Sequence, residues 1–316
     1  MPLPILFDTD IGSDVDDALA LGVVLGAPEA LELVAVTTVG REPEQRARIA
    51  ARLLGLAGRA EVEVCAGERT PLLRPERAFG WWGNEEAGIH EGPEAKLSDE
   101  PAAERIVRAA RETADLEIVA VGPMTNVARA LALCPSLPRR VAGITIMGGH
   151  IRQVAVGERI CEPGVDYNLC SDPEASMAVL GAGFRTRLVT ADVTLQTWLR
   201  EGDLERMSGA GPVARAIADQ VRLWAPVQRT IFVERLGGTL APDNVAFLHD
   251  PLTVLALFDE NPLHFEELQV LPTISRGVLR TLEVDAALGI GSPMKTATAV
   301  DADLARDRIV ERLLRL

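Results

Sequence analysis

The chain has few lysines and no excess of positive charge. Of its 316 residues, 32 are Lys or Arg and 46 are Asp or Glu, so the formal net charge at pH 7 is −14. Lys96 and Lys295 are the only lysines, which leaves two candidates for any mechanism that needs one. Non-specific binding to nucleic acids or anionic lipids requires clustered basic charge. The acidic balance therefore argues against both kinds of partner.

Long apolar runs and paired cysteines are also missing. No uncharged apolar run reaches the roughly 18 residues of a membrane-spanning helix. The residues before Asp8 lack the basic and apolar regions of a secretion signal. No CxxC pair occurs, which disfavours a metal finger and a disulfide framework; the four cysteines are Cys65, Cys134, Cys161 and Cys170. We therefore expect reduced thiols, a cytoplasmic location and no membrane partner.

Short apolar runs rich in β-formers alternate with longer helical patterns. The apolar runs that predict strands are 5–7, 33–36, 61–65, 116–121, 144–147 and 187–190. The helical patterns between and beside them cover 18–25, 43–57, 99–113, 125–133 and 172–180. This order predicts an α/β fold with an open, mostly parallel, Rossmann-like central sheet flanked by helices.

The second half of the chain is predicted to be more helical. Its helical patterns are 194–207, 211–235, 250–258 and 301–314, and its possible strands are 267–271, 279–285 and 296–300. Residues 67–98 and 148–168 are predicted to be long loops, which in a compact protein are usually functional or disordered. No linker divides the sequence, so we expect one domain over residues 1–316.

Five carboxylates follow the first predicted strand within ten residues: Asp8, Asp10, Asp14, Asp16 and Asp17. Helix capping accounts for one or two of them. Two carboxylates about 4 Å apart repel by about 4 kcal/mol at an effective dielectric constant near 20. A cation should offset that repulsion, and carboxylate oxygens are ligands for Ca²⁺ or Mg²⁺. The segment therefore favours a metal site.

Two enzyme families begin in a similar way. Haloacid-dehalogenase-type phosphatases also carry Asp-x-Asp after an apolar strand, but their site needs a later lysine and an acidic pair. Neither lysine of this chain lies at a strand end before such a pair. The run from Asp8 to Ala18 resembles more closely the opening motif Asp-x-Asp-x-Gly-x-Asp-Asp-Ala of the nucleoside hydrolases (inosine–uridine-preferring type), with two residues inserted before Asp16-Asp17-Ala18. The insertion leaves open whether Asp14 or Asp16 takes one of the motif's roles.

Further segments match this family in order along the chain. They are Thr37-Thr38-Val39, Gly122-Pro123-Met124-Thr125-Asn126, Met147-Gly148-Gly149, Asp166-Tyr167-Asn168, Asp172-Pro173-Glu174-Ala175 and His249-Asp250-Pro251. Each has a structural explanation by itself, such as a turn for the Gly-Gly pair or a helix start for Asp172-Pro173. His90, His150 and His264 are interpreted as structural.

The resemblance implies Ca²⁺-dependent hydrolysis of the N-glycosidic bond of ribonucleosides, which gives ribose and a free base. By resemblance, Asp10, Asp17, the Thr125 carbonyl and Asp250 would hold calcium. Asp10 would act as general base toward water activated by the metal. His249 is the candidate acid or polariser near the departing base.

Polar groups matched to hydroxyls make a sugar site discriminating. The candidate substrate-binding residues are Asp14, Asp16, Glu42, Asn84, Met147, Asp166, Asn168 and Trp224. Several depart from the family pattern: Glu42 stands where Asn is usual, Asn84 lies in a loop that often carries His, and Asp166 replaces Glu. The loop 150–165 also lacks the family's Asn for the 5′ hydroxyl. The expected metal ligands thus match the family pattern, whereas the residues expected near the base and near the 5′ hydroxyl differ from it.

Two other functions stay open. The changed base side motivates a nucleoside- or ribose-binding protein that keeps the metal without turnover, and the Asp-x-Asp start motivates a metal-dependent phosphatase. The family analogy adds a small-molecule nucleoside as partner, a homodimer or homotetramer, and a place in purine or pyrimidine salvage. The sequence does not identify the base.

Overall fold

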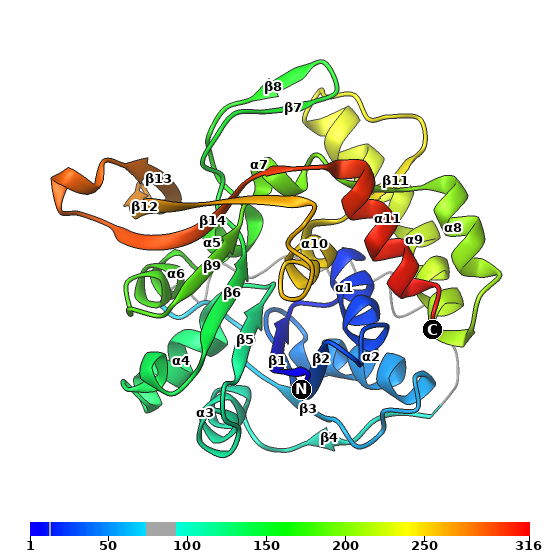
Figure 1. The fold of residues 1–316 in the computed structure, drawn as a ribbon, viewed down its shortest axis with the longest axis horizontal. Coiled ribbons are helices and arrows are strands. Elements are labelled where there is room, and N and C mark those ends of the chain that lie inside the picture. The colour runs from blue at the N-terminus through cyan, green and yellow to red at the C-terminus, as the bar shows by residue number, and fades with distance from the viewer. Residues whose placement is uncertain (13, 74–92) are drawn as a thin grey trace.

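The computed structural model of the chain describes residues 1–12, 14–73 and 93–316. Its main feature is a sheet of ten strands (Figure 1). In spatial order these are β13 (Val278–Val284), β12 (Leu263–Ser275), β14 (Ser292–Val300), β9 (Thr186–Val189), β6 (Gly143–Met147), β5 (Glu117–Ala120), β1 (Leu3–Thr9), β2 (Leu31–Thr38), β3 (Glu63–Ala66) and β4 (Leu97–Ser98). From β14 to β4 all neighbours are parallel, whereas β12 is antiparallel to both of its neighbours. The predicted open, mostly parallel sheet is confirmed.

Helices cover both faces of this sheet because its central strands are apolar on both sides. On β1, Ile5 and Phe7 belong to one core and Leu6 to the other, as the alternation of side chains along a strand requires. The first core is completed by α1 (Asp16–Leu25), α2 (Pro43–Leu56), α9 (Pro212–Arg229), α10 (His249–Leu255) and α11 (Ala302–Leu313). The second is completed by α3 (Ala102–Glu112), α4 (Thr125–Leu133) and α6 (Pro173–Leu180). These two sets lie on opposite sides of the sheet in Figure 1.

Two sequence-based predictions were wrong in detail. The predicted loop 148–168 contains a hairpin, β7 (Val154–Val156) and β8 (Arg159–Cys161), which turns at Gly157 with a positive φ of 61°. The predicted helix 194–207 is split into α7 (Ala191–Thr194), β10 (Trp198–Arg200) and α8 (Glu201–Ser208). The split arises because β10 pairs with the distant β11 (Asn244–Phe247), and such pairing overrides local helical propensity.

The remaining elements are short. They are α5 (Tyr167–Ser171), the 3₁₀ turns η2 (Leu137–Arg139) and η4 (Ala286–Leu288), and the π-helical segment η3 (Thr230–Arg235) that continues α9. No helix in the described part of the chain is long and apolar enough to cross a membrane. All four cysteines carry free thiols.

The contact between α1 and α11 gives a stability test. A Cβ on Gly26 would overlap the backbone carbonyl of Arg312, although the φ of Gly26 (−82°) suits any residue. We expect Gly26→Ala to lower the free energy of unfolding by about 1–3 kcal/mol, since backbone must move. Gly202, exposed in α8 with nothing within 4 Å of a Cβ, is the control. Gly202→Ala should raise stability by about 0.5–1 kcal/mol. Denaturant unfolding measures both, and equal effects would contradict the packing.

Candidate active site

A cavity of about 610 Å³ lies at the carboxyl ends of the parallel strands. Its lining includes Asp10 just after β1, Val121 just after β5, Met147 at the end of β6 and Ala191 just after β9. Ligands of open α/β sheets bind at this edge because the loops that follow the strands converge there. The cavity holds nearly all of the site residues expected from the sequence.

One end of the cavity is acidic. Asp10, Asp16 and Asp17 are buried, and carboxylate oxygens of Asp14, Asp16 and Asp17 lie within 4.8 Å of one another. Asp250 comes from the first turn of α10, and its Oδ1 is buried without a hydrogen-bond partner among the described residues. The folded chain therefore brings an acid from near residue 250 to the N-terminal acidic segment.

Burial and mutual repulsion disfavour ionisation of this cluster. Removal from water, with the charge of Asp10, raises the pKa of Asp14 to about 8. The same causes raise the pKa of Asp17 well above its usual value, and the pKa of Asp250 is raised by burial and by the charges of Asp17, Asp14 and Asp10. A divalent cation would remove this repulsion. The residues present thus fit a metal ion.

The buried Arg46 of α2 forms hydrogen bonds with the backbone of the acidic segment. Its guanidinium donates hydrogen bonds to the backbone carbonyls of Asp10 and Ile11 (3.2 Å for Ile11) and to that of Arg41 at 2.8 Å. Its charge also lowers the pKa of Asp17, against the larger effect of burial. Arg46 was not among the residues expected from the sequence.

The five N-terminal acids have different tasks, and Asp8 lies within β1. Asp8 does not line the cavity; its Oδ1 accepts hydrogen bonds from Thr37 Oγ1 (2.6 Å) and Asn126 Nδ2 (2.7 Å), which ties β1 to β2 and α4. Burial raises the pKa of Asp8 to about 7. Asp14 Oδ1 accepts from the backbone N–H of Asp16 at 3.0 Å. Asp14 and Asp16 both line the cavity. The two residues inserted relative to the family's opening motif therefore add one carboxylate to the cavity.

A second wall is formed by the segment after β6 and by α5. Asn168 Nδ2 donates to the carbonyls of Val121 (2.6 Å) and Met147 (3.3 Å), which fixes the amide at the cavity. Asp166 caps α5 by accepting from the Leu169 N–H at 2.8 Å, and its pKa is raised chiefly by burial. This wall offers oriented hydrogen-bonding groups.

His249 is held in one orientation. Its Nδ1 lies 2.6 Å from the hydroxyl of the buried Thr194, and its ring centroid is 5.4 Å from that of Phe247. Burial lowers the pKa of His249 to about 4, so the imidazole is neutral at pH 7. When the Thr194 hydroxyl donates to Nδ1, the ring proton is on Nε2. Trp224 of α9 also lines the cavity and is buried.

Three expected residues are not placed in the cavity. Glu42 begins α2 with a positive φ of 59°, and its carboxylate pairs with Arg69 at 3.1 Å. Thr125 begins α4, where its hydroxyl donates to Asp172 at 2.6 Å. Neither lines the cavity, so the Thr125 carbonyl stays a predicted ligand. Asn84 lies outside the described residues, as does His90.

Sequence reasoning also missed a residue that holds His249 and two kinds of residue that line the cavity. Thr194, which holds His249, is 55 positions away from it, and nothing local indicated the pair. His150 was interpreted as structural, yet it lines the cavity directly after the Gly148-Gly149 turn; its position after a strand end was the available signal. The apolar wall was also missed, and it includes Val156, Leu195, Ile231, Phe232, Leu236 and Phe247.

Comparison with known proteins agrees with this geometry. The family described as inosine-uridine preferring nucleoside hydrolase matches residues 5–307. The chain belongs to this family. Nucleoside hydrolases act on N-glycosyl bonds, so the chain is a hydrolase of N-glycosyl compounds.

Relatives of this nucleoside hydrolase differ in the base that their names report. A pyrimidine-specific ribonucleoside hydrolase, RihA, of Enterobacter sp. (strain 638) is 33% identical over 261 residues, which cover 80% of this chain and 78% of the relative. A plant nucleoside hydrolase structure has a TM-score of 0.82, 26% identity and 99% coverage of both chains. A purine-preferring ribonucleoside hydrolase from Gardnerella vaginalis has a TM-score of 0.79, 26% identity and 98% coverage of both chains.

The raised carboxyl pKa values predict how stability depends on pH. Between about pH 4 and pH 8 the folded metal-free protein keeps protons that the unfolded chain has released, so its stability should fall as the pH rises through this window. Saturating Ca²⁺ should remove most of the fall. Melting temperatures from pH 5 to 9, with chelator and with calcium, measure the effect.

Substitution of Asp14 identifies the source of this dependence. Asp14→Asn should make the decline of the metal-free protein shallower, because one ionisation that the cluster disfavours is removed. Asp115→Asn is the control, since Asp115 is exposed with a positive φ of 55° that Asn also tolerates. An unchanged decline in Asp14→Asn would mean that the acidic cluster does not govern it.

Proposed function

We propose that the chain hydrolyses the N-glycosidic bond of ribonucleosides in a Ca²⁺-dependent reaction that yields ribose and a free base. The observation that carries the proposal is the convergence of Asp10, Asp14, Asp17 and Asp250 in one cavity that also contains Asn168 and the neutral His249. This single site would serve a single domain over residues 1–316.

Asp10, Asp17, Asp250 and the Thr125 carbonyl are the proposed calcium ligands. Calcium accepts six to eight oxygen ligands in flexible geometry, which suits a set of carboxylates drawn from two distant segments. When bound, the ion would lower the pKa of the attacking water and coordinate vicinal hydroxyls of the ribose. The buried, unpartnered Oδ1 of Asp250 supports this assignment.

The chain's own residues would divide the remaining work. Asp10 accepts the proton of the water whose oxygen attacks C1′, and the electron pair of the broken C1′–N bond passes to the base. Attack from the side of the acidic cluster inverts C1′. Asp14, Asp16 and Asn168 hold ribose hydroxyls. Glu42 has no part in this scheme, because its carboxylate pairs with Arg69 outside the cavity.

His249 would act on the departing base. With its pKa lowered to about 4, it polarises the leaving nitrogen as a neutral hydrogen-bond donor through Nε2–H. In this proposal the Thr194 hydroxyl, 2.6 Å from Nδ1, donates to Nδ1 and so leaves the ring proton on Nε2. The base itself would lie against the apolar wall and Trp224. An apolar wall accepts many flat rings, and the named relatives include pyrimidine-specific and purine-preferring enzymes. We therefore propose no base preference.

The other two functions are less well supported. A phosphatase of the Asp-x-Asp type would need a lysine at the site, but Lys96 pairs with Glu63 at 3.2 Å and Lys295 with Glu260 at 2.6 Å, and neither lines the cavity. A binding protein without turnover would have the same cavity and is distinguished by experiment. By family analogy we also propose a cytoplasmic homodimer or homotetramer in purine or pyrimidine salvage.

Removal of the proposed general base is the direct test. Asp10→Asn should lower the release of free base and reducing sugar from a panel of nucleosides by about 10²–10⁴-fold. Circular dichroism checks that the variant is folded, and Asp115→Asn serves as the exposed control. Full activity in Asp10→Asn would refute the assigned base. Tight nucleoside binding by wild type without sugar release would indicate a binding protein, and phosphate release from nucleotides without free base a phosphatase.

The contact between Thr194 and His249 predicts that the effect of substituting Thr194 on kcat depends on the leaving group of the substrate. Thr194→Val should lower kcat on nucleosides about tenfold, because the unpaired imidazole no longer presents Nε2–H reliably. Hydrolysis of p-nitrophenyl riboside, whose leaving group is stable as an anion, should change much less. Thr194→Ser keeps the hydroxyl and should behave like wild type. An equal loss on both substrates would contradict this role.

A further inference from the structure

His150 lines the cavity but has no part in the scheme above. It follows Gly148-Gly149 at the end of β6 and is only 7% exposed. Its Nε2 is buried without a hydrogen-bond partner in the described structure. Buried polar atoms are normally paired, so an unpaired ring nitrogen at a cavity wall points to a partner that arrives with a ligand.

The backbone around His150 is fixed by the outer part of the sheet. The His150 N–H donates to Thr281 Oγ1 of β13 at 3.1 Å. Gly149 has a positive φ of 84°, and a Cβ on it would lie 3.0 Å from the same Thr281 oxygen. Glycine is therefore required there. This contact determines where the imidazole enters the cavity.

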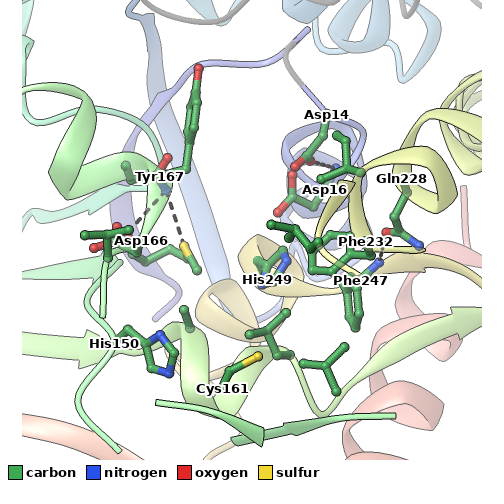
Figure 2. A pocket seen from close by; sticks show the side chains of 18 of the residues that line it. Asp14, Asp16, His150, Cys161, Asp166, Tyr167, Gln228, Phe232, Phe247 and His249 are labelled. Carbon is green, nitrogen blue, oxygen red and sulfur yellow. Dashed lines mark hydrogen bonds between the residues drawn. The ribbon is translucent and has the colours of Figure 1, made fainter. Parts of the chain in front are cut away.

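His150 and Asp166 share one side of the cavity. Figure 2 shows both side chains across from Asp14 and Asp16, with His249 between the two sides. The two groups are close enough for His150 to lower the pKa of Asp166, against the larger effect of burial. A carboxylate accepts hydrogen bonds and an imidazole N–H donates one, so together they match a hydroxyl, which does both.

We propose that His150 is a specificity-determining residue that donates Nε2–H to the 5′-hydroxyl of the substrate, while Asp166 accepts the hydroxyl proton. This inference rests on the proposed function. The vicinal 2′- and 3′-hydroxyls are the pair that can bind at the acidic cluster, which leaves the 5′-hydroxyl for the opposite side. The loop after β6 would thus supply the 5′ contact through an imidazole. A 5′-phosphate would meet the buried Asp166 carboxylate, so the site selects nucleosides over nucleotides.

The test compares a ribonucleoside with its 5′-deoxy analogue. His150→Ala should lower kcat/KM about tenfold on the ribonucleoside and less than twofold on the 5′-deoxy analogue, because only the first loses a hydrogen bond. His150→Gln keeps an N–H donor and should recover most of the loss. His264→Ala, at an exposed histidine of β12 outside the cavity, should leave both substrates unchanged.

An equal loss on both substrates in folded His150→Ala would overturn the proposal, as would an unchanged kcat/KM on the ribonucleoside. Thermal unfolding of each variant separates these results from misfolding. If wild type turns over neither substrate, the proposed function fails, and calorimetric binding of the same two ligands then decides the role of His150. A tenfold weaker affinity confined to the ribonucleoside would still support it, and equal affinities would refute it.

Discussion

Repulsion among buried carboxylates is the constraint on which this site depends. The sheet directs the segment after β1 and the start of α10 to the same edge, and there burial and the charge of Asp10 raise the pKa values of Asp14, Asp17 and Asp250. Such an arrangement costs stability in water-poor surroundings. The chain offsets part of the cost with the buried Arg46, which donates to backbone carbonyls of the acidic segment and whose charge lowers the pKa of Asp17. A bound divalent cation would offset the rest of this free-energy cost.

The two sides of the cavity are built on different principles. The acidic side is formed by carboxyl groups whose joint ionisation is unfavourable without a cation. The opposite side is formed by neutral or capped groups whose positions are fixed by hydrogen bonds: Asn168 to two carbonyls, and Asp166 to the start of α5. A ribose presents hydroxyls on both sides of its ring, so charge and fixed geometry together can orient it. The apolar wall, to which β7, η3 and β11 contribute, leaves the base less constrained than the sugar.

Much of the fold could be predicted because its central strands are short, apolar on both faces and separated by helical patterns. The predicted helix 125–133 matches α4, and the predicted helix 43–57 ends within a residue of α2. Predictions were wrong where pairing partners are distant. The residues of β10 lie next to helical patterns, yet they pair with β11 more than 40 positions later. The hairpin of β7 and β8 was missed because its strands have only three residues each.

Candidate site residues could be named where a motif follows a strand end, as for Asp10, Asp17, Asn168, His249 and Asp250, all of which line the cavity. Glu42 was predicted to bind substrate on the same grounds, but its carboxylate forms an ion pair with the Arg69 guanidinium. The sequence by itself determined the parallel sheet, the site edge and the acidic segment, since these depend on local periodicity and on residue order. Only the tertiary structure decided that Thr194 holds His249, that Arg46 supports Asp10 and that His150 enters the cavity unpaired. Those contacts join residues far apart in the chain, and their geometry exists only once the sheet and its helices have packed.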